Sequence, residues 1–157
     1  MFTLLLEVIN MKVYSNSFKE KENIPIKYTC EGENISPHVR WEEFPKETKS
    51  FVLIMSDPDA PFGTFYHWIL YDIPNNIGEI KEGESIGKKG KNDFGKLGYG
   101  GPCPPRGHGK HRYYITIYAL NVESLGIKEG ASAKEVLKAI EGKIIAKGEF
   151  YGIYERK

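Results

Sequence analysis

Side chains able to do chemistry gather in three short parts of the chain, each next to a run of apolar residues. The first part is a proline-containing turn that carries Asp57 and Asp59, and the second is His67. The third is the Gly- and Pro-rich stretch 98–113, which ends in Tyr113. Each part alone is typical of an ordinary turn or of a structural histidine. Loops at strand ends commonly carry binding residues, so the combination predicts a site.

The mixture of groups in these three parts suits a phosphate or a phosphomonoester. Histidine side chains and the backbone N–H groups of a Gly-rich loop can donate to phosphate oxygens. Carboxylates can orient the imidazoles or accept from an ammonium or hydroxyl group. The motifs G-x-x-x-x-G-K-[ST] and G-x-G-x-x-G are both absent from the sequence, which argues against the usual nucleotide loops. We therefore predict binding of a small anionic group.

A metal-dependent hydrolase is the alternative interpretation of the same residues. His38, His67, His108 and His111, together with the two aspartates, could be read as a metal site. However, His108 and His111 lie on a Gly-rich loop, and neither H-E-x-x-H nor G-x-S-x-G occurs. We expect a binding protein rather than an enzyme, without a cofactor and without a metal ion.

Positive charge is concentrated in the middle of the chain. Residues 81–112 contain eight Lys or Arg against three Asp or Glu, whereas the whole chain has a net charge of only +1. Such a segment attracts anions locally, and Phe94 and Tyr99 among its lysines could stack on bases. The near-neutral chain and the lack of a known nucleic-acid module argue against nucleic acid as a partner.

Four apolar runs predict the strands that would position these residues. They cover 51–55, 68–71, 113–120 and 144–154. The first run contains no polar residue, which indicates a strand buried on both faces. In the last run, Gly148 and Gly152 are predicted to be β-bulges.

One helix is predicted between the third and the fourth of these apolar runs. Ser132 and Glu135 have the spacing of a capping box, and apolar residues follow at helical spacing. Gly142 can adopt the left-handed conformation that ends a helix.

The 157 residues are expected to form a single domain, 1–157, with residues 1–10 as an N-terminal extension and Met11 as an alternative start. The N-terminal apolar stretch is short and carries Glu7, so it is expected to be neither a signal peptide nor a membrane span. A cytoplasmic location is expected. Cys30 and Cys103 can form one disulfide or remain free, and both alternatives are open. Aromatic-rich strands are also compatible with a homodimer.

Three long blocks carry a resemblance to a known family. The blocks are 57–61 (Asp-Pro-Asp-Ala-Pro), 67–74 (His-Trp-Ile-Leu-Tyr-Asp-Ile-Pro) and 101–113, and residues 28–37 with Trp41 form an opening block. They resemble the signature blocks of the phosphatidylethanolamine-binding proteins, also called Raf kinase inhibitor-like proteins. The opening block resembles that of the bacterial and archaeal branch. The resemblance extends from about residue 11 to the end of the chain.

This resemblance implies a mostly β fold with a large antiparallel sheet, a smaller sheet and one or two short helices. It also implies a small anion pocket at one end of the sheet. The residues that it assigns to ligand binding are Asp57, Asp59, His67, Cys103, His111 and Tyr113. Pro61 resembles a proline that shapes the turn, for which a cis bond is one expectation. Arg112 is expected to be a structural ion-pair partner rather than a ligand contact.

The implied partner is a small anionic ligand, namely phosphate, a phosphomonoester or a phospholipid head group. Modulation of a kinase or a protease is a further expectation from the family.

Overall fold

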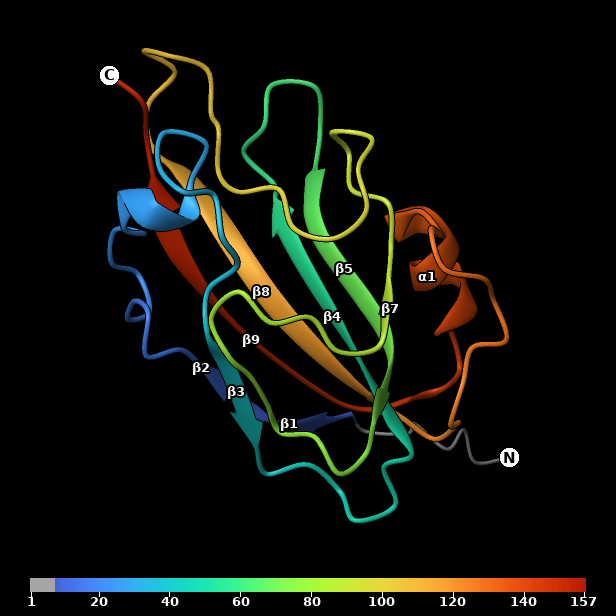
Figure 1. The fold of residues 1–157 in the computed structure, drawn as a ribbon. Coiled ribbons are helices and arrows are strands. Elements are labelled where there is room, and N and C mark those ends of the chain that lie inside the picture. The colour runs from blue at the N-terminus through green and yellow to red at the C-terminus, as the bar shows by residue number, and fades with distance from the viewer. Residues whose placement is uncertain (1–7) are drawn as a thin grey trace, which may run out of the picture.

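The apolar runs of the chain pair into one large sheet, which Figure 1 shows in the computed structural model, where residues 8–157 are described. The six strands of this sheet, in spatial order, are β1 (Ile9–Asn10), β9 (Ile144–Tyr154), β8 (His111–Leu120), β4 (Ser50–Asp57), β5 (Phe65–Pro74) and β7 (Lys88–Lys89). All neighbours are antiparallel except β1 and β9, which pair in parallel. The large sheet is therefore antiparallel, as expected, apart from the short parallel pair that β1 adds at its edge. The expected N-terminal extension contributes β1, while residues 1–7 of it lie outside the described part.

A smaller sheet and a helix cover opposite faces of the large sheet. The smaller sheet contains β2 (Lys12–Tyr14), β3 (Val39–Glu42) and β6 (Glu79–Ile80), in that order. The other face is covered by α1 (Ala133–Ala139), and a single 3₁₀ turn, η1 (Ile26–Tyr28), precedes β3. The mostly β fold with a smaller sheet and short helices is thus confirmed.

Strand β4 lies between β8 and β5 in the interior of the large sheet and buries side chains on both of its faces. Phe51 and Leu53 belong to the core beneath the smaller sheet. Val52 and Ile54 alternate with them and belong to a second core, which includes Val136 of α1. The alternation follows from the two-residue period of a strand. The prediction that this run is buried on both faces is confirmed.

Helix α1 begins with the predicted capping box. The backbone N–H of Glu135 donates to the Ser132 hydroxyl at 3.2 Å, and the backbone N–H of Ser132 donates to a Glu135 carboxylate oxygen at 3.4 Å. Gly142 has a φ of 76°, the left-handed conformation expected after the helix. No helix in the region 8–157 is long and apolar enough to cross a membrane.

Two glycines of β9 are explained by close packing rather than by bulges. Strand pairing continues in register through Gly148 and Gly152, which face Ile117 and Tyr113 on β8, so the prediction of bulges was wrong. A Cβ atom at Gly148 would lie 2.3 Å from the carbonyl oxygen of Met11. At Gly152 it would lie 2.6 Å from side-chain atoms of neighbouring core residues. Because glycine has no Cβ atom, the N-terminal segments can lie directly on β9 at these two positions.

The two cysteines form a disulfide between segments far apart in the sequence. Cys30 and Cys103 are bonded, with their Cα atoms 5.4 Å apart. The backbone N–H of Cys30 also donates to the carbonyl oxygen of Pro102 at 3.1 Å. The bridge therefore fastens the stretch before β8 to the segment that follows η1. The peptide bond of Pro61 is trans, as are all others from residue 8 onward, which overturns the cis alternative.

Candidate functional site

Loops from separate parts of the chain meet at one end of the large sheet and enclose a pocket of about 400 Å³. In Figure 1 this is the upper end, where the β4–β5 turn and the segment before β8 come together. The wall consists of Asp57, Ala60, Pro61, Phe62, Gly63, Thr64, Phe65, His67, Asp93, Phe94, Cys103, Pro104, Pro105, His111 and Tyr113. A cavity of this size fits a small organic ligand.

The base of the pocket contains a buried pair of side chains from neighbouring strands. Asp57 ends β4 and His111 begins β8, and antiparallel pairing brings these two ends together. The Nδ1 atom of His111 lies 2.7 Å from Oδ2 of Asp57, and both residues are almost fully buried. Since an ionised carboxylate can only accept, Nδ1 of His111 carries the proton of this bond. The Nε2 atom of His111 lies 2.6 Å from Nδ1 of His108.

His67 enters the same pocket from β5 as a neutral ring. Its Nδ1 atom lies 2.7 Å from the carbonyl oxygen of Gly100, which can only accept, so Nδ1 carries the proton. Burial lowers the pKa of His67 below the ordinary value for histidine. The ring is therefore uncharged at pH 7, and Nε2 is the atom that remains for a ligand. Tyr113 and Phe94 lie edge-on to it, with ring centroids 5.3 and 5.4 Å away.

Tyr113 contributes a hydroxyl group that lacks a hydrogen-bond partner within residues 8–157. The side chain comes from β8 and is fully buried. Burial raises the pKa of Tyr113 most, and the nearby Asp57 carboxylate raises it further through its charge and a weak hydrogen-bonding interaction, so the hydroxyl remains protonated. A buried hydroxyl without a partner costs about 1–3 kcal/mol of stability. A ligand oxygen placed next to this donor would recover part of that energy.

Asp59 and Arg112 form an ion pair beside the pocket rather than on its wall. Two guanidinium nitrogens of Arg112 donate to the two Asp59 oxygens at 2.8 and 2.9 Å, and the backbone N–H of Arg112 donates at 2.8 Å. The side-chain hydrogen bond lowers the pKa of Asp59. The structural role predicted for Arg112 is confirmed. Asp59 fixes the β4–β5 turn to β8, and the structure does not bring its carboxylate into the pocket.

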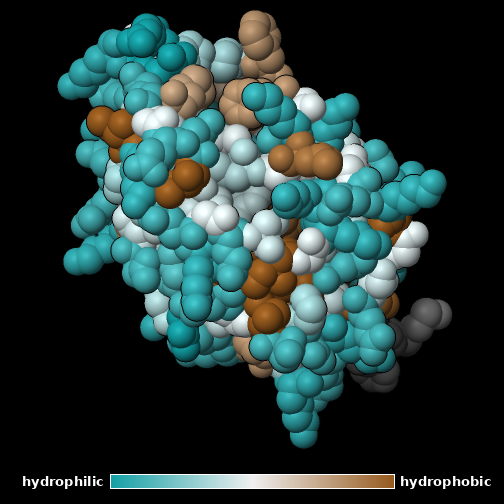
Figure 2. Space-filling model, in the orientation of Figure 1, coloured by the Kyte–Doolittle hydropathy of each residue, from teal (hydrophilic) through white to brown (hydrophobic). Residues whose placement is uncertain are grey.

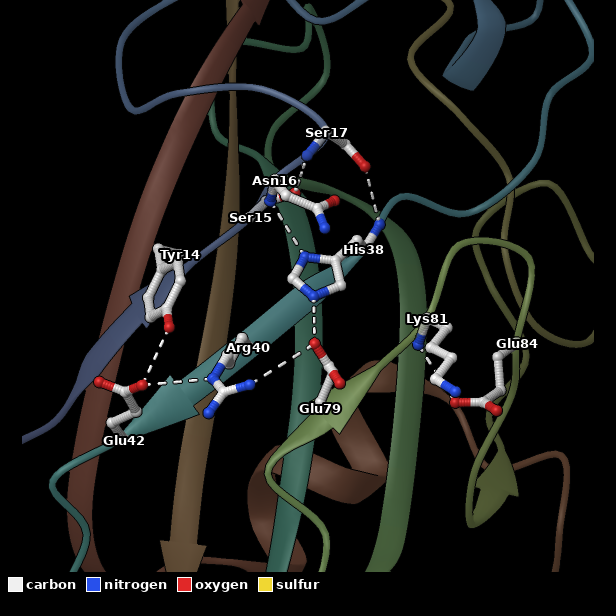
Figure 3. A network of polar contacts seen from close by, with 10 residues as sticks. All are labelled: Tyr14, Ser15, Asn16, Ser17, His38, Arg40, Glu42, Glu79, Lys81 and Glu84. Carbon is white, nitrogen blue, oxygen red and sulfur yellow. Dashed lines mark hydrogen bonds and ion pairs between the residues drawn. The ribbon is translucent and has the colours of Figure 1, made fainter.

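The remaining predicted residues are Cys103, which lies on the pocket wall, and His38, which lies outside the pocket. Cys103 lines the pocket, but its sulfur belongs to the disulfide and is not a thiol. His38 lies directly before β3, in the separate polar network of Figure 3, where its Nε2 is 2.6 Å from a Glu79 oxygen. Its Nδ1 accepts the backbone N–H of Asn16 at 3.0 Å. His38 therefore does not join the other three histidines.

The apolar rim of the pocket was not predicted from the sequence. Phe62 is fully exposed on the β4–β5 turn, and Phe94 is 46% exposed on the segment after β7. Figure 2 shows hydrophobic side chains among hydrophilic ones at the upper end of the molecule, where this turn projects. A signal was available, because phenylalanines in a Gly- and Pro-rich turn belong to no apolar run. His108 was considered only as a metal ligand, although its spacing from His111 already placed both on one loop.

Comparisons with known proteins agree with this arrangement. The family model described as phosphatidylethanolamine-binding protein matches residues 14–155. A UPF0098 protein of Aquifex aeolicus is 57% identical and the match covers 93% of this chain and 89% of the relative. The UPF0098 protein PH1269 of Pyrococcus horikoshii is 49% identical over 96% of this chain and 79% of the relative.

Two solved structures share the fold. The homologue CT736 from Chlamydia trachomatis, described as a putative phosphatidylethanolamine-binding protein homologue, has a TM-score of 0.87 and 40% identity. E. coli YBCL, described as a new member of the mammalian family, has a TM-score of 0.88 and 31% identity. In both cases 94% of this chain and 99% of the other chain are covered. The chain belongs to the phosphatidylethanolamine-binding protein family.

Proposed function

We propose that the pocket binds a small anionic ligand without converting it, and that the ligand is phosphate, a phosphomonoester or a phospholipid head group. The observation that carries this proposal is the convergence of His67, His111 and Tyr113, from two strands of one sheet, on a single pocket. Tyr113 brings a protonated hydroxyl with no partner in the described part of the chain. An anion oxygen is the acceptor that this donor fits.

Each polar residue has a distinct part in the proposed binding. Tyr113 donates its hydroxyl proton to an anion oxygen. His67 either accepts a proton from a P–OH group through Nε2 or takes up a proton when the anion arrives, since a nearby negative charge favours the imidazolium. Asp57 is held by His111 at 2.7 Å, and Asp93, the other carboxylate on the pocket wall, accepts from the backbone N–H of Tyr66 at 2.8 Å.

The apolar rim supports an organic phosphate over inorganic phosphate. Phe62, Phe65 and Phe94 line the pocket together with prolines of the segment before β8. Removal of apolar ligand surface from water contributes about 25 cal/mol per Å². The cavity of about 400 Å³ suits a head group better than long acyl chains.

The test is a titration with phosphate, O-phosphoethanolamine and a nucleoside monophosphate, followed through the four histidine signals by NMR. We expect His67 and His111 to shift together and to saturate, with the two esters binding more tightly than phosphate. His38 is the internal control, because it lies in the separate network of β3. The absence of any histidine response at millimolar ligand would refute an anion pocket.

A metal-dependent hydrolase remains the alternative. Asp57, His111 and His108 contact one another in a line, which supports a proton path more than a shared metal ion. Within residues 8–157, no group of three or more His, Cys, Asp or Glu side chains is arranged to hold a metal ion. Stoichiometric zinc in the purified protein would favour the hydrolase. Modulation of a kinase or a protease rests on family membership and is tested by adding the protein to such enzymes.

A further inference from the structure

Three titratable side chains form a continuous line from the base of the pocket to the protein surface. Asp57 and His111 are 3% and 1% exposed, whereas His108 is an exposed residue. The contacts are 2.7 Å from Asp57 to His111 and 2.6 Å from His111 to His108. His108 lies between Gly107 and Gly109, which have φ values of 74° and 93°. These left-handed glycines turn the loop sharply on both sides of His108.

The position of each proton in this line follows from the chemistry of the groups. Asp57 accepts, so Nδ1 of His111 is protonated. Nε2 of His111 and Nδ1 of His108 are 2.6 Å apart, and a hydrogen bond between them contains one proton. When the pair carries no net charge, that proton belongs to His108, and His108 Nε2 is a free acceptor. One further proton can therefore enter only at the exposed Nε2 of His108.

We propose that His108 is the proton port of the pocket: it passes a proton to the buried His111, and its Nδ1 then accepts from the His111 imidazolium and stabilises that charge, so that anion binding takes up one proton. This inference rests on the proposed function, because it concerns the same pocket. His108 acts through His111 and is a positioning residue.

The proton transfer balances without any additional reactant except a buffer acid. A proton from the buffer binds Nε2 of His108, while the proton on Nδ1 of His108 moves to Nε2 of His111. His108 ends neutral with its proton on Nε2, and its Nδ1 accepts from the His111 imidazolium. The new positive charge is thus located next to Asp57 and on the pocket wall, where an anion would bind.

Other charged and titratable groups near this pair set the background for its titration. They are Asp57 at the end of β4, Asp59 on the β4–β5 turn, His67 on β5, Asp93 on the segment after β7, Arg112 and Tyr113 on β8, Tyr154 opposite His111 on β9, and Arg106, Lys110 and Arg156 near His108. Asp59 is paired with Arg112. Burial lowers the pKa of His67, so that ring is neutral near pH 7 before an anion binds.

Sulfate is the probe, because it remains a dianion from pH 5.5 to 8.5 and any pH dependence then belongs to the protein. Calorimetry in two buffers of different ionisation enthalpy gives both the affinity and the number of protons taken up. For the unmodified protein we expect uptake of about one proton per sulfate near pH 7.5. Because sulfate keeps its charge over this range, its affinity should fall as the pH rises if binding takes up a proton.

The variant is His108→Ala, and Lys110→Ala is the matched control on the same loop. We expect His108→Ala to bind sulfate about tenfold more weakly at pH 7, to take up fewer protons, and to approach the unmodified protein at pH 5.5. The control removes a full positive charge but leaves the histidine pair, so its proton uptake should not change. Equal pH profiles for His108→Ala and the unmodified protein would overturn the proposal. Tighter binding by His108→Ala at every pH would also overturn it, because His108 would then hinder the access of sulfate to His111.

A ligand-free measurement separates this proposal from the proposed function. The ¹⁵N signals of His108 and His111 should change together as the pH is varied, because the two rings share one proton, and His108→Ala should alter the pH response of His111. Independent midpoints would contradict the proton port even if sulfate binds. Coupled midpoints without any sulfate binding would keep the proton path and reject the anion pocket.

Discussion

Replacement of Tyr113 by phenylalanine should stabilise the free protein and weaken ligand binding. The Tyr113 side chain is fully buried, and its hydroxyl has no partner in the described residues. A buried polar group without a hydrogen bond costs about 1–3 kcal/mol, so its removal should raise the free energy of unfolding by at least about 1 kcal/mol. For a domain of this length, about 1 kcal/mol corresponds to a rise in Tm of roughly 2–4 °C.

The same hydroxyl should contribute to anion affinity. A hydrogen bond to a charged group is worth about 1.5–3 kcal/mol, so sulfate or O-phosphoethanolamine should bind roughly 10- to 150-fold more weakly to Tyr113→Phe. Urea unfolding gives the stability, and calorimetry gives the affinity. The two measurements should therefore change in opposite senses for a single deleted oxygen atom.

Tyr71→Phe is the matched control for this experiment. Tyr71 is equally buried, but its hydroxyl donates to the carbonyl oxygen of Lys128 and accepts from the backbone N–H of Ala131. Its removal leaves two groups without a partner and should lower stability by about 1–2 kcal/mol. If Tyr113→Phe were destabilised to the same extent and kept its anion affinity, the Tyr113 hydroxyl would have a structural partner and the reasoning would be refuted.

Three further predictions concern the groups around the pocket. Asp59→Asn should weaken the attachment of the β4–β5 turn to Arg112. The folded-state pKa of Asp59 is lowered, so the stability that its ionised carboxylate contributes is present above the ordinary carboxyl range and is lost as the pH falls through the lowered pKa. Urea unfolding from pH 3 to 7 should show a flatter acid limb for Asp59→Asn, and an unchanged limb would contradict this. The pKa of His67 is also lowered, so stability should fall as pH drops below about 6.5, and His67→Gln should flatten the curve between pH 7 and 5. Reduction of the Cys30–Cys103 disulfide, which spans a sequence separation of 73, should lower the free energy of unfolding by about 4 kcal/mol, measured with and without dithiothreitol. An equal denaturation midpoint under both conditions would show that the bridge does not constrain the unfolded chain.

The sequence predicted the elements whose signals are local. Apolar runs located the long strands, since β4, β5, β8 and β9 each contain one of the predicted runs. The spacing of Ser132 and Glu135 located the start of α1, because a capping box involves residues only three apart. Asp57, His67 and Tyr113 could be grouped in advance because they lie at or near the ends of adjacent strands.

Features that depend on distant parts of the chain could not be predicted in the same way. The parallel pairing of β1 with β9 joins Ile9 to Ala146, and no local pattern specifies such a pair. Gly148 was interpreted as a bulge, because the close approach of the Met11 backbone is invisible in the sequence of β9. Asp59 has the same residue type and almost the same position as Asp57. The difference between them is the presence of Arg112, which lies 53 residues away along the chain.

Departures from ordinary packing rules carry information about function only where several occur together. Of the buried side-chain groups without a partner in the described region, one is Nε1 of Trp41 and the other is the Tyr113 hydroxyl. Trp41 lies in the smaller sheet and its side chain belongs to the apolar core, so its orphaned donor by itself suggests no ligand. Around Tyr113, by contrast, lie a neutral buried histidine and a buried aspartate–histidine pair that each reduce stability unless a partner is present. A bound anion would satisfy the hydroxyl and favour the charged imidazoles at once, and by linkage it should raise stability by an amount that grows with the logarithm of the ligand concentration divided by Kd.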